Sequence, residues 1–297
     1  RIAIITPVYP PYGGGMGTLA RDHAEMLARA GHDVTVMTPR KRSVLAATPG
    51  VFIRGLRPLC TYGNAALLPQ LFFALDDFDG VHLHYPFLGA AEFVLWWKAL
   101  ASRRTRLVVT YHMDLVGTGW LARFFRAYNQ RVLPDLAEQA DKITVTSDDY
   151  AQGSLLAKLS SRVRKKIVVL PPSIDDGRFS PNAKEDFLSV RLERNPKERT
   201  VLFVGGLDRA HYFKGIPVLL RAFLKLRSRA PESKAVLVIV GDGNLRPMYE
   251  RLAAALGLRD RVIFLGKVLD EELPAAYRLA DVVVLPSIDR SEAFGIV

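Results

Sequence analysis

A glycine-rich stretch near the start of the sequence has the residue types that bind phosphate. Residues 10–17 precede a helical pattern, so Gly14 and Gly15 are expected at a helix N-terminus, where free amides and the helix dipole favour an anion. The spacing does not fit the dinucleotide fingerprint, and the lysine that ends a P-loop is missing. Phosphate contact is the favoured interpretation, and a tight turn without a ligand is the alternative.

Two groups of polar residues follow apolar runs later in the first half. His112 and Asp114 come after one run, and His82, His84 and Tyr85 close another. Ligands of open α/β sheets bind at the carboxyl ends of strands, so these side chains are candidates for one edge of a sheet. A lone histidine is nevertheless more often structural than catalytic. His82 and His84 share a strand face, but no third ligand falls at a recognisable spacing, so no metal site is predicted.

The second half has glycine turns after three apolar runs. They fall at Gly205 and Gly206, at Gly241 and Gly243, and at Gly266. Lys214 stands beside a further glycine at the start of a helical pattern, where a cation and an open backbone suit a diphosphate. Taken alone, this lysine could be an ordinary solvated side chain. The three turns together indicate a nucleotide that lies across the strand ends.

The last residues combine a carboxylate with an open backbone. Glu292 is followed by Ala293, Phe294 and Gly295. The carboxylate could hold sugar hydroxyls, and the amides beside the glycine could hold a phosphate. By itself Glu292 is an ordinary loop acid, so its interpretation depends on the surrounding motifs.

Alternating apolar runs and helical patterns supply the elements that position these residues. Strands, mostly buried and parallel, are expected at 2–5, 34–37, 81–84, 107–110, 143–146, 167–170, 201–204, 235–240, 262–265 and 282–285. Helices are expected at 18–30, 217–229, 245–256 and 271–279. Proline, aspartate and a charged stretch indicate a linker at 171–199. We therefore expect an α/β protein with two Rossmann-like, doubly wound parallel-sheet domains, 1–170 and 200–297, that face a cleft.

Composition narrows the class of protein. The 297 residues are 49% hydrophobic, which is enough for two domains, and no apolar run reaches the roughly 18 residues of a spanning helix. The net charge of +11 suits an anionic membrane or a phosphorylated ligand, or consists of solvated side chains, and no nucleic-acid-binding signature accompanies it. The single cysteine, Cys60, and a start on a strand rather than a signal peptide favour the cytoplasm.

In combination these motifs resemble the retaining glycosyltransferases of GT-B architecture, specifically glycosyltransferase family 4, which includes mannosyltransferases that act on lipid acceptors. The likeness covers essentially the whole chain, from the loop at 13–17 to the segment at 292–295. It implies transfer of a hexose from a nucleoside diphosphate sugar, GDP-mannose or a UDP-sugar, to a lipid-linked or glycan acceptor. The anomeric configuration is retained, and no metal is required.

The resemblance also implies roles for individual residues. Gly14 and Gly15 approach the donor phosphates or the reacting centre, and His112 lies beside the transferred sugar and orients it. Lys214 resembles the family's diphosphate-binding lysine, and Glu292 resembles the first glutamate of its paired motif. The other implied positions are Gly241, Val268, Ala293, Phe294 and Gly295 on the donor side, with the Val268 backbone meeting the base, and Tyr85 and Asp114 on the acceptor side.

Three departures from the family pattern qualify the resemblance. Family members commonly carry an arginine where this chain has Gly206, and the longer loop that follows predicts that Arg209 or His211 supplies the missing cation. The interdomain motif appears in altered form at 171–175. The second glutamate of the pair would fall beyond Val297, so the C-terminal end of this chain is expected to be incomplete.

Acceptor and partner predictions remain broader. At 120–131 aromatics and arginines interleave at helical spacing, which is typical both of membrane-surface helices and of packed helices with snorkelling arginines. Packing is the favoured interpretation for the aromatics, and peripheral contact with anionic lipid at the inner face of the membrane is the alternative. The rival functions are a phosphorylase or sugar-phosphate synthase of similar architecture, and a non-catalytic nucleotide-sugar-binding protein.

Overall fold

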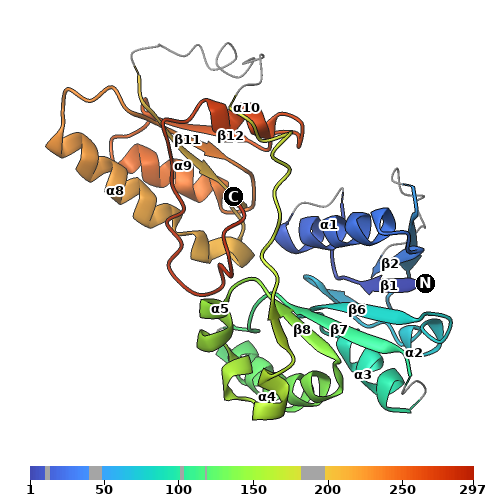
Figure 1. The fold of residues 1–297 in the computed structure, drawn as a ribbon. Helices are drawn as coiled ribbons and strands as arrows, with labels where there is room; N and C mark the ends of the chain where they lie inside the picture. Colours follow the sequence, from blue (N-terminus) through green and yellow to red (C-terminus); the bar gives the residue numbers. More distant parts are fainter. Residues whose placement is uncertain (11–13, 40–48, 101–103, 118, 182–197) are drawn as a thin grey trace. The chain divides into compact units, whose positions relative to one another are not determined.

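The protein consists of two compact units. The computed structural model describes residues 1–10, 14–39, 49–100, 104–117, 119–181 and 198–297 (Figure 1). Contacts group Arg1–Ser173 and Ile296 into the first unit, and Ile174–Gly295 and Val297 into the second. Part of the expected linker, 182–197, lies outside the described residues, as does the first glycine of the loop at 13–17.

The first unit is built on a parallel sheet with the strand order β3-β2-β1-β6-β7-β8-β9 (Figure 1). The strands are β1 (Ile2–Ile5), β2 (Val34–Pro39), β3 (Val51–Leu56), β6 (Gly80–Tyr85), β7 (Arg106–Tyr111), β8 (Lys142–Val145) and β9 (Ile167–Val169). All were expected from apolar runs except β3. Only the two end residues of β3, Val51 and Leu56, are buried, because it is an edge strand, and its apolar signal is correspondingly weak.

Helices connect these strands. They are α1 (Gly15–Arg29), α2 (Leu71–Ala74), α3 (Ala91–Leu100), α4 (Gly119–Gln139), α5 (Asp148–Gly153), the 3₁₀ helix η1 (Leu155–Lys158) and α6 (Ser161–Arg164). A hairpin of β4 (Thr61–Tyr62) and β5 (Ala65–Ala66) precedes α2. The buried stripe of α1 includes Ala20, His23 and Ala24, and the two alanines share a core cluster with Ile4 and Val36 of the sheet.

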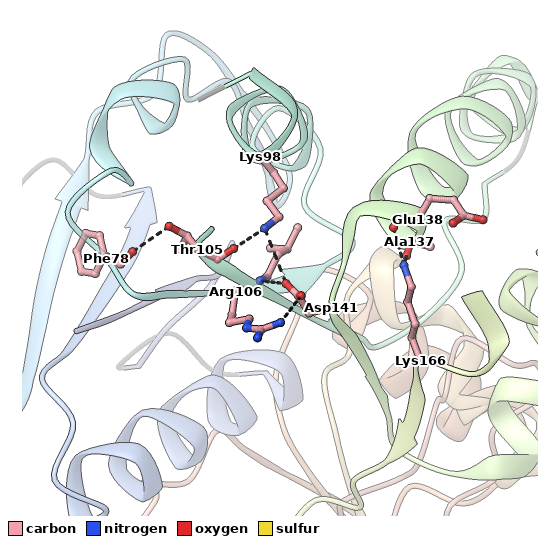
Figure 2. A network of polar contacts seen from close by, with 9 residues as sticks. Phe78, Lys98, Thr105, Arg106, Ala137, Glu138, Asp141 and Lys166 are labelled. Atoms are coloured by element: carbon pink, nitrogen blue, oxygen red, sulfur yellow. Dashed lines mark hydrogen bonds and ion pairs between the residues drawn. The ribbon is translucent and has the colours of Figure 1, made fainter. Parts of the chain in front are cut away.

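The amino ends of the central strands are fixed by a carboxylate, Asp141, at the start of β8 (Figure 2). Its Oδ2 accepts from the backbone N–H of Leu107 at 2.8 Å and its Oδ1 from Arg106 at 3.0 Å, while Lys98 Nζ lies 3.8 Å from Oδ2. The lysine also donates to the carbonyl of Thr105. This network ties α3, β7 and β8 together at the edge of the sheet where the amino ends of these strands lie.

The second unit contains a smaller parallel sheet with the strand order β12-β11-β10-β13. The strands are β10 (Thr200–Val204), β11 (Val236–Val240), β12 (Val262–Gly266) and β13 (Val282–Val283). Alternate residues of β11 face opposite sides, so that Leu237 and Ile239 join one core cluster and Val236 and Val238 another. Burial on both faces explains the continuous apolar runs in the sequence.

Helices cover the two faces of this sheet. They are α8 (Ile216–Arg229), α9 (Arg246–Ala255) and α10 (Leu273–Arg278), and the 3₁₀ helix η2 (Arg209–Lys214) precedes α8. Residues of α8 and α9 pack in the first cluster, and Ala275 and Ala276 of α10 pack in the second. The unit is therefore doubly wound, as the sequence predicts.

The aromatic and basic stretch of α4 is only partly packed. Tyr128 is buried, but Trp120 is 73% exposed and Phe124 is 49% exposed, so the packing expected for the aromatics is wrong at these two positions. Arg123 and Arg126 are exposed as well. Among the helices of the described residues, none has both the length and the apolar character needed to cross a bilayer.

Candidate functional site

The glycine turns of the second unit are held to one another by main-chain hydrogen bonds. Gly205 N donates to Val240 O, Leu207 N to Asp242 O and Gly241 N to Gly266 O, each at 2.9 Å. Gly241 has a φ of +134°, and a Cβ there would lie 1.9 Å from the carbonyl oxygen of Gly205. Only glycine fits this approach, so the carboxyl ends of β10, β11 and β12 form one continuous, tightly packed backbone surface.

The end of η2 is joined to the last loop of the chain in the same way. Ile288 N donates to Phe213 O at 2.8 Å. Gly215, at φ +69°, lies so close to this loop that a Cβ would be 2.1 Å from the carbonyl oxygen of Pro286. These contacts bring two segments that are distant in the sequence into register, and they place Lys214 beside Glu292.

Lys214 and Glu292 form a largely buried ion pair. The Nζ to Oε2 distance is 2.7 Å, and the two side chains are 10% and 16% exposed. Ser287 Oγ donates to the same carboxylate oxygen at 3.1 Å, and the lysine ammonium lies 5.7 Å from the centre of the Phe213 ring. A buried pair with added hydrogen bonds keeps both charges in place, whereas loss of one partner would strand the other. The pair presents an ammonium and a carboxylate at a surface lined by backbone.

The loop between β10 and η2 explains the glycine at position 206. A Cβ there would lie 2.8 Å from Nδ1 of His211, so the imidazole occupies the space that a side chain at 206 would need. Asp208 holds this ring, with Oδ2 2.9 Å from Nδ1, and also caps η2 through the amides of Ala210 and His211. Arg209 is exposed and contributes its backbone N–H to Asn244 Oδ1 at 3.1 Å. Of the two expected substitutes for the missing arginine, His211 is the one packed against Gly206.

The other expected donor-side residues surround this surface or open α1. Val268 is buried in a core cluster, so its side chain is structural and only its backbone is available. Phe294 is 47% exposed, and Gly295 follows at φ +77°. In the first unit, Gly14 precedes α1 at φ +144° and Gly15 is its first residue, which gives the helix N-terminus that the sequence predicts.

At the carboxyl edge of the first sheet the structure brings histidines together. His112 follows β7 and is 7% exposed, its backbone N–H donates to Tyr85 O at 2.9 Å, and its Nε2 lies 2.9 Å from Nδ1 of His84. His82 Nε2 is 2.6 Å from the hydroxyl oxygen of Thr110, which is 2.7 Å from that of Thr144. The histidines that the sequence places on one sheet edge therefore belong to one hydrogen-bonded and ring-stacked cluster.

Both residues expected on the acceptor side are hydrogen-bonded to other residues of the first unit. Tyr85 is fully buried, and its hydroxyl donates to Asn129 Oδ1 at 3.3 Å. Asp114 accepts from the Tyr111 hydroxyl and, at 3.2 Å, from the backbone N–H of Leu155. Burial and the nearby Asp114 carboxylate raise the pKa of Tyr85. These contacts suit residues that position a loop.

Burial sets the charge state of the histidine cluster. It lowers the pKa of His82 and of His112 to about 3 and that of His23 to about 4, and it lowers the pKa of His84 well below its usual value. Neighbouring histidines depress the pKa values of His82, His84 and His112 further, because each would repel a second positive charge. All four imidazoles are therefore neutral at pH 7.

Comparison with known families covers nearly all of the chain. The family described as Glycosyltransferase Family 4 matches residues 13–178, and the family described as Glycosyl transferases group 1 matches residues 184–297. The chain belongs to glycosyltransferase family 4. It is a retaining, nucleotide-sugar-dependent glycosyltransferase of GT-B fold, and the family predicted from the sequence is confirmed.

Curated relatives of this glycosyltransferase act on several acceptors. The chain is 31% identical to phosphatidyl-myo-inositol mannosyltransferase of Mycobacterium tuberculosis, over all of this chain and 74% of the relative. It is 30% identical to D-inositol 3-phosphate glycosyltransferase of Salinispora tropica, over 96% of this chain and 64% of the relative. It is 31% identical to O-antigen chain mannosyltransferase C of Escherichia coli, over 74% and 53%. The chain thus spans between about half and three quarters of the length of these proteins.

Solved structures share the fold of this glycosyltransferase. Sucrose-phosphate synthase from Thermosynechococcus elongatus superposes with a TM-score of 0.78 at 23% identity, over 99% of this chain and 77% of that one. The Anabaena protein HepE in complex with UDP and glucose superposes with a TM-score of 0.68 at 18% identity, over 95% and 73%.

Sequence reasoning missed one member of the glycosyltransferase's histidine cluster. His23 of α1 stacks on His82 with ring centroids 5.2 Å apart and lies 5.5 Å from His84. The signal was its place on the buried stripe of α1, three residues after Ala20 and one before Ala24. A helix that follows β1 packs on the sheet, so a polar residue on that stripe must point at the strands.

Proposed function

We propose that this glycosyltransferase transfers a hexose from GDP-mannose or a UDP-sugar to a lipid-linked or glycan acceptor, and that the Lys214–Glu292 pair is the centre of its donor site. The observation that supports this most is the pair itself, a 2.7 Å contact between two nearly buried charges at the end of three glycine turns. The ammonium suits a diphosphate and the carboxylate suits sugar hydroxyls, the two polar parts of the donor.

Departure of the nucleoside diphosphate is the step that this chemistry assists. Negative charge grows on the diphosphate as the bond to the anomeric carbon breaks, and a preorganised ammonium with nearby backbone amides stabilises it. In the second unit, Lys214 and the amides of Phe294 and Gly295 are the groups we assign to this role. For the first unit we separately propose that the helix N-terminus at Gly14 and Gly15 binds phosphate. His112, neutral at pH 7, is assigned to orient the transferred sugar rather than to take a proton.

The acceptor proposal draws on the relatives and on α4. Two relatives are named for phosphatidylinositol and for an O-antigen chain. In this chain Trp120 and Phe124 are exposed on α4 among exposed arginines, which is the pattern of a surface that meets anionic lipid. We therefore favour a lipid-linked acceptor.

A panel of nucleotide sugars tests the donor proposal. We expect one donor to raise the melting temperature of the purified protein more than its free nucleotide does, and to be consumed when a lipid-linked acceptor is added. Binding without transfer to any acceptor would support a nucleotide-sugar sensor, and transfer to inorganic phosphate would support a phosphorylase.

Liposome flotation tests the lipid surface of α4. We expect the protein to float with anionic but not with zwitterionic liposomes, and the double variant Trp120→Ser, Phe124→Ser should abolish this binding.

A further inference from the structure

Three histidines of the first unit meet around one point. His23 comes from α1, and His82 and His84 come from β6. One ring nitrogen from each lies within 4.8 Å of the other two. The ring centroids are 5.2 Å apart for His23 and His82, 5.5 Å for His23 and His84, and 4.8 Å for His82 and His84. These nearly equal separations describe a triangle of rings rather than a row.

Two of the rings have a buried nitrogen without a hydrogen-bond partner in the described part of the chain. They are Nδ1 of His23 and Nε2 of His84. Buried polar atoms without a partner are costly and therefore rare, so two in one cluster indicate a missing partner. His82 uses its Nε2 with Thr110, which leaves its Nδ1 for another contact. Each of the three histidines therefore has one nitrogen to offer.

The chemistry of these three nitrogens selects a borderline divalent metal. Neutral imidazole is a good ligand for zinc, copper and nickel and a poor one for magnesium or calcium, which prefer oxygen. All three rings are buried, which favours the neutral imidazole, and the neutral form is the one that binds a metal. Nitrogen ligands of tetrahedral zinc lie about 3.4 Å apart for Zn–N bonds of about 2.0–2.1 Å, so rotation of the rings would have to close the triangle by on the order of 1 Å.

The outer nitrogens of two ligands are already supported as metal-bound histidines require. His82 is held through its Nε2 by Thr110, which is held in turn by Thr144. His84 is held through its Nδ1 by His112 at 2.9 Å. Partners of this kind fix the tautomer and the orientation of a ligating imidazole.

We propose that His23, His82 and His84 form a binding site for a divalent transition metal, with zinc as the best fit. Three nitrogen ligands leave a fourth coordination position. The site lies within the first unit and is separate from the Lys214–Glu292 pair, so it does not depend on the donor proposal. A metal on Nε2 of His84 makes Nδ1–H the donor to Nε2 of His112, and so fixes the tautomer of His112.

Zinc titration of the chelator-treated protein tests this site. In competition with a chromophoric zinc chelator we expect one equivalent to bind, and zinc to raise the melting temperature. His23→Gln and His84→Gln should each weaken binding by at least 10-fold, because each removes one of three ligands. His32→Gln is the matched control, since His32 is exposed and follows α1, and it should bind as the unmodified protein does.

Other results would overturn the proposal. They are no saturable zinc binding by the unmodified protein, or zinc binding that both glutamine variants retain. If the variants fail to fold, cobalt in the unmodified protein decides: four-coordinate cobalt with nitrogen ligands absorbs strongly in the visible range. A spectrum of hydrated cobalt alone would exclude the site. Because each readout is metal binding, a negative result would not affect the sugar-transfer proposal. Equally, absence of sugar transfer would not affect the metal-site proposal.

Discussion

The carboxyl edges of the two sheets both bury ionisable side chains, but those of the first sheet are neutral and those of the second are charged and paired. At the edge of the first sheet, four imidazoles from α1, β6 and the end of β7 are buried together and are neutral. At the edge of the second sheet, Lys214 and Glu292 are almost as well buried and are in ion-pair contact at 2.7 Å. A buried group without a counter-charge loses its charge, whereas a buried group with one keeps it.

This difference separates what the two edges can bind. A neutral histidine cluster offers lone pairs and N–H groups, which suit a metal or a sugar hydroxyl. An ion pair on a glycine-lined surface offers full charges, which suit a diphosphate and its sugar. From this comparison of the two edges we propose that the edge of the second sheet binds anions and that the edge of the first sheet orients a ligand.

The largest effect is expected from breaking the ion pair. In Lys214→Met the side chain keeps its length but loses the ammonium, so growing charge on the leaving diphosphate is unsupported and Glu292 is left unpaired. We expect kcat/KM for the donor to fall on the order of 10²–10³-fold. Steady-state kinetics measures this, with Lys225→Met, at an exposed residue of α8, as the control. A fall no larger than that of the control would remove the pair from the site.

A smaller effect is expected from the first edge. His112→Ala should lower kcat by about 10- to 100-fold and change donor affinity much less, because a neutral orienting group acts on the geometry of the reacting sugar. Kinetics together with a donor titration by calorimetry separates the two quantities. An unchanged rate would contradict the orienting role, and an equal loss of affinity would make His112 a donor-binding residue. His32→Ala provides the control.

The loop at Gly206 sharpens the comparison further. If His211 replaces the missing arginine, His211→Ala should raise the donor KM by up to about 10-fold. Gly206→Ala should act similarly, because its Cβ would lie 2.8 Å from the His211 ring, and it should add little in the His211→Ala background. Arg209→Ala is expected to have a smaller effect. If both Arg209→Ala and His211→Ala leave donor affinity and turnover unchanged, neither residue supplies the cation.

The smallest effect is expected at the amino-terminal edge of the first sheet, where the charge of Asp141 stabilises the fold. Burial would raise the pKa of Asp141, but hydrogen bonds from the Leu107 N–H and Arg106, together with Lys98, outweigh it and lower the pKa. Ionised Asp141 therefore stabilises the fold above the unfolded pKa of about 3.9, and this stability is lost as pH falls through the lower folded pKa. Asp141→Asn should lower the free energy of unfolding by ~1–2 kcal/mol at pH 7.

Urea denaturation at several pH values tests this account. The difference between Asp141→Asn and the unmodified protein should shrink as the pH is lowered below about 4, because Asp141 becomes protonated first in the unfolded state and, at still lower pH, in the folded state. Asp77→Asn, at an exposed aspartate, should show no such pattern. A difference that is constant with pH would mean that the charge of Asp141 contributes nothing.

Much of the fold could be predicted because buried parallel strands leave continuous apolar runs. The runs that became β10 and β11 are of this kind, and the glycine turns after them identify the candidate site. Edge strand β3 could not be found in this way, because solvent on one side removes the apolar signal. The contact between His23 and β6 was equally hidden, since it depends on how α1 rotates over the sheet and not on spacing along the chain. The pairing of Lys214 with Glu292 needed the long-range contact between Ile288 and Phe213.

The close approach of Gly241 to Gly205 has a consequence for how this enzyme could be redesigned. The shape of the second edge is set largely by the main chain, because its glycine turns are hydrogen-bonded to each other through peptide groups. Side chains next to this edge, such as His211 and Phe294, can therefore be substituted while the main-chain surface keeps its shape. Libraries that aim for a new donor should vary those projecting positions and hold the glycines fixed.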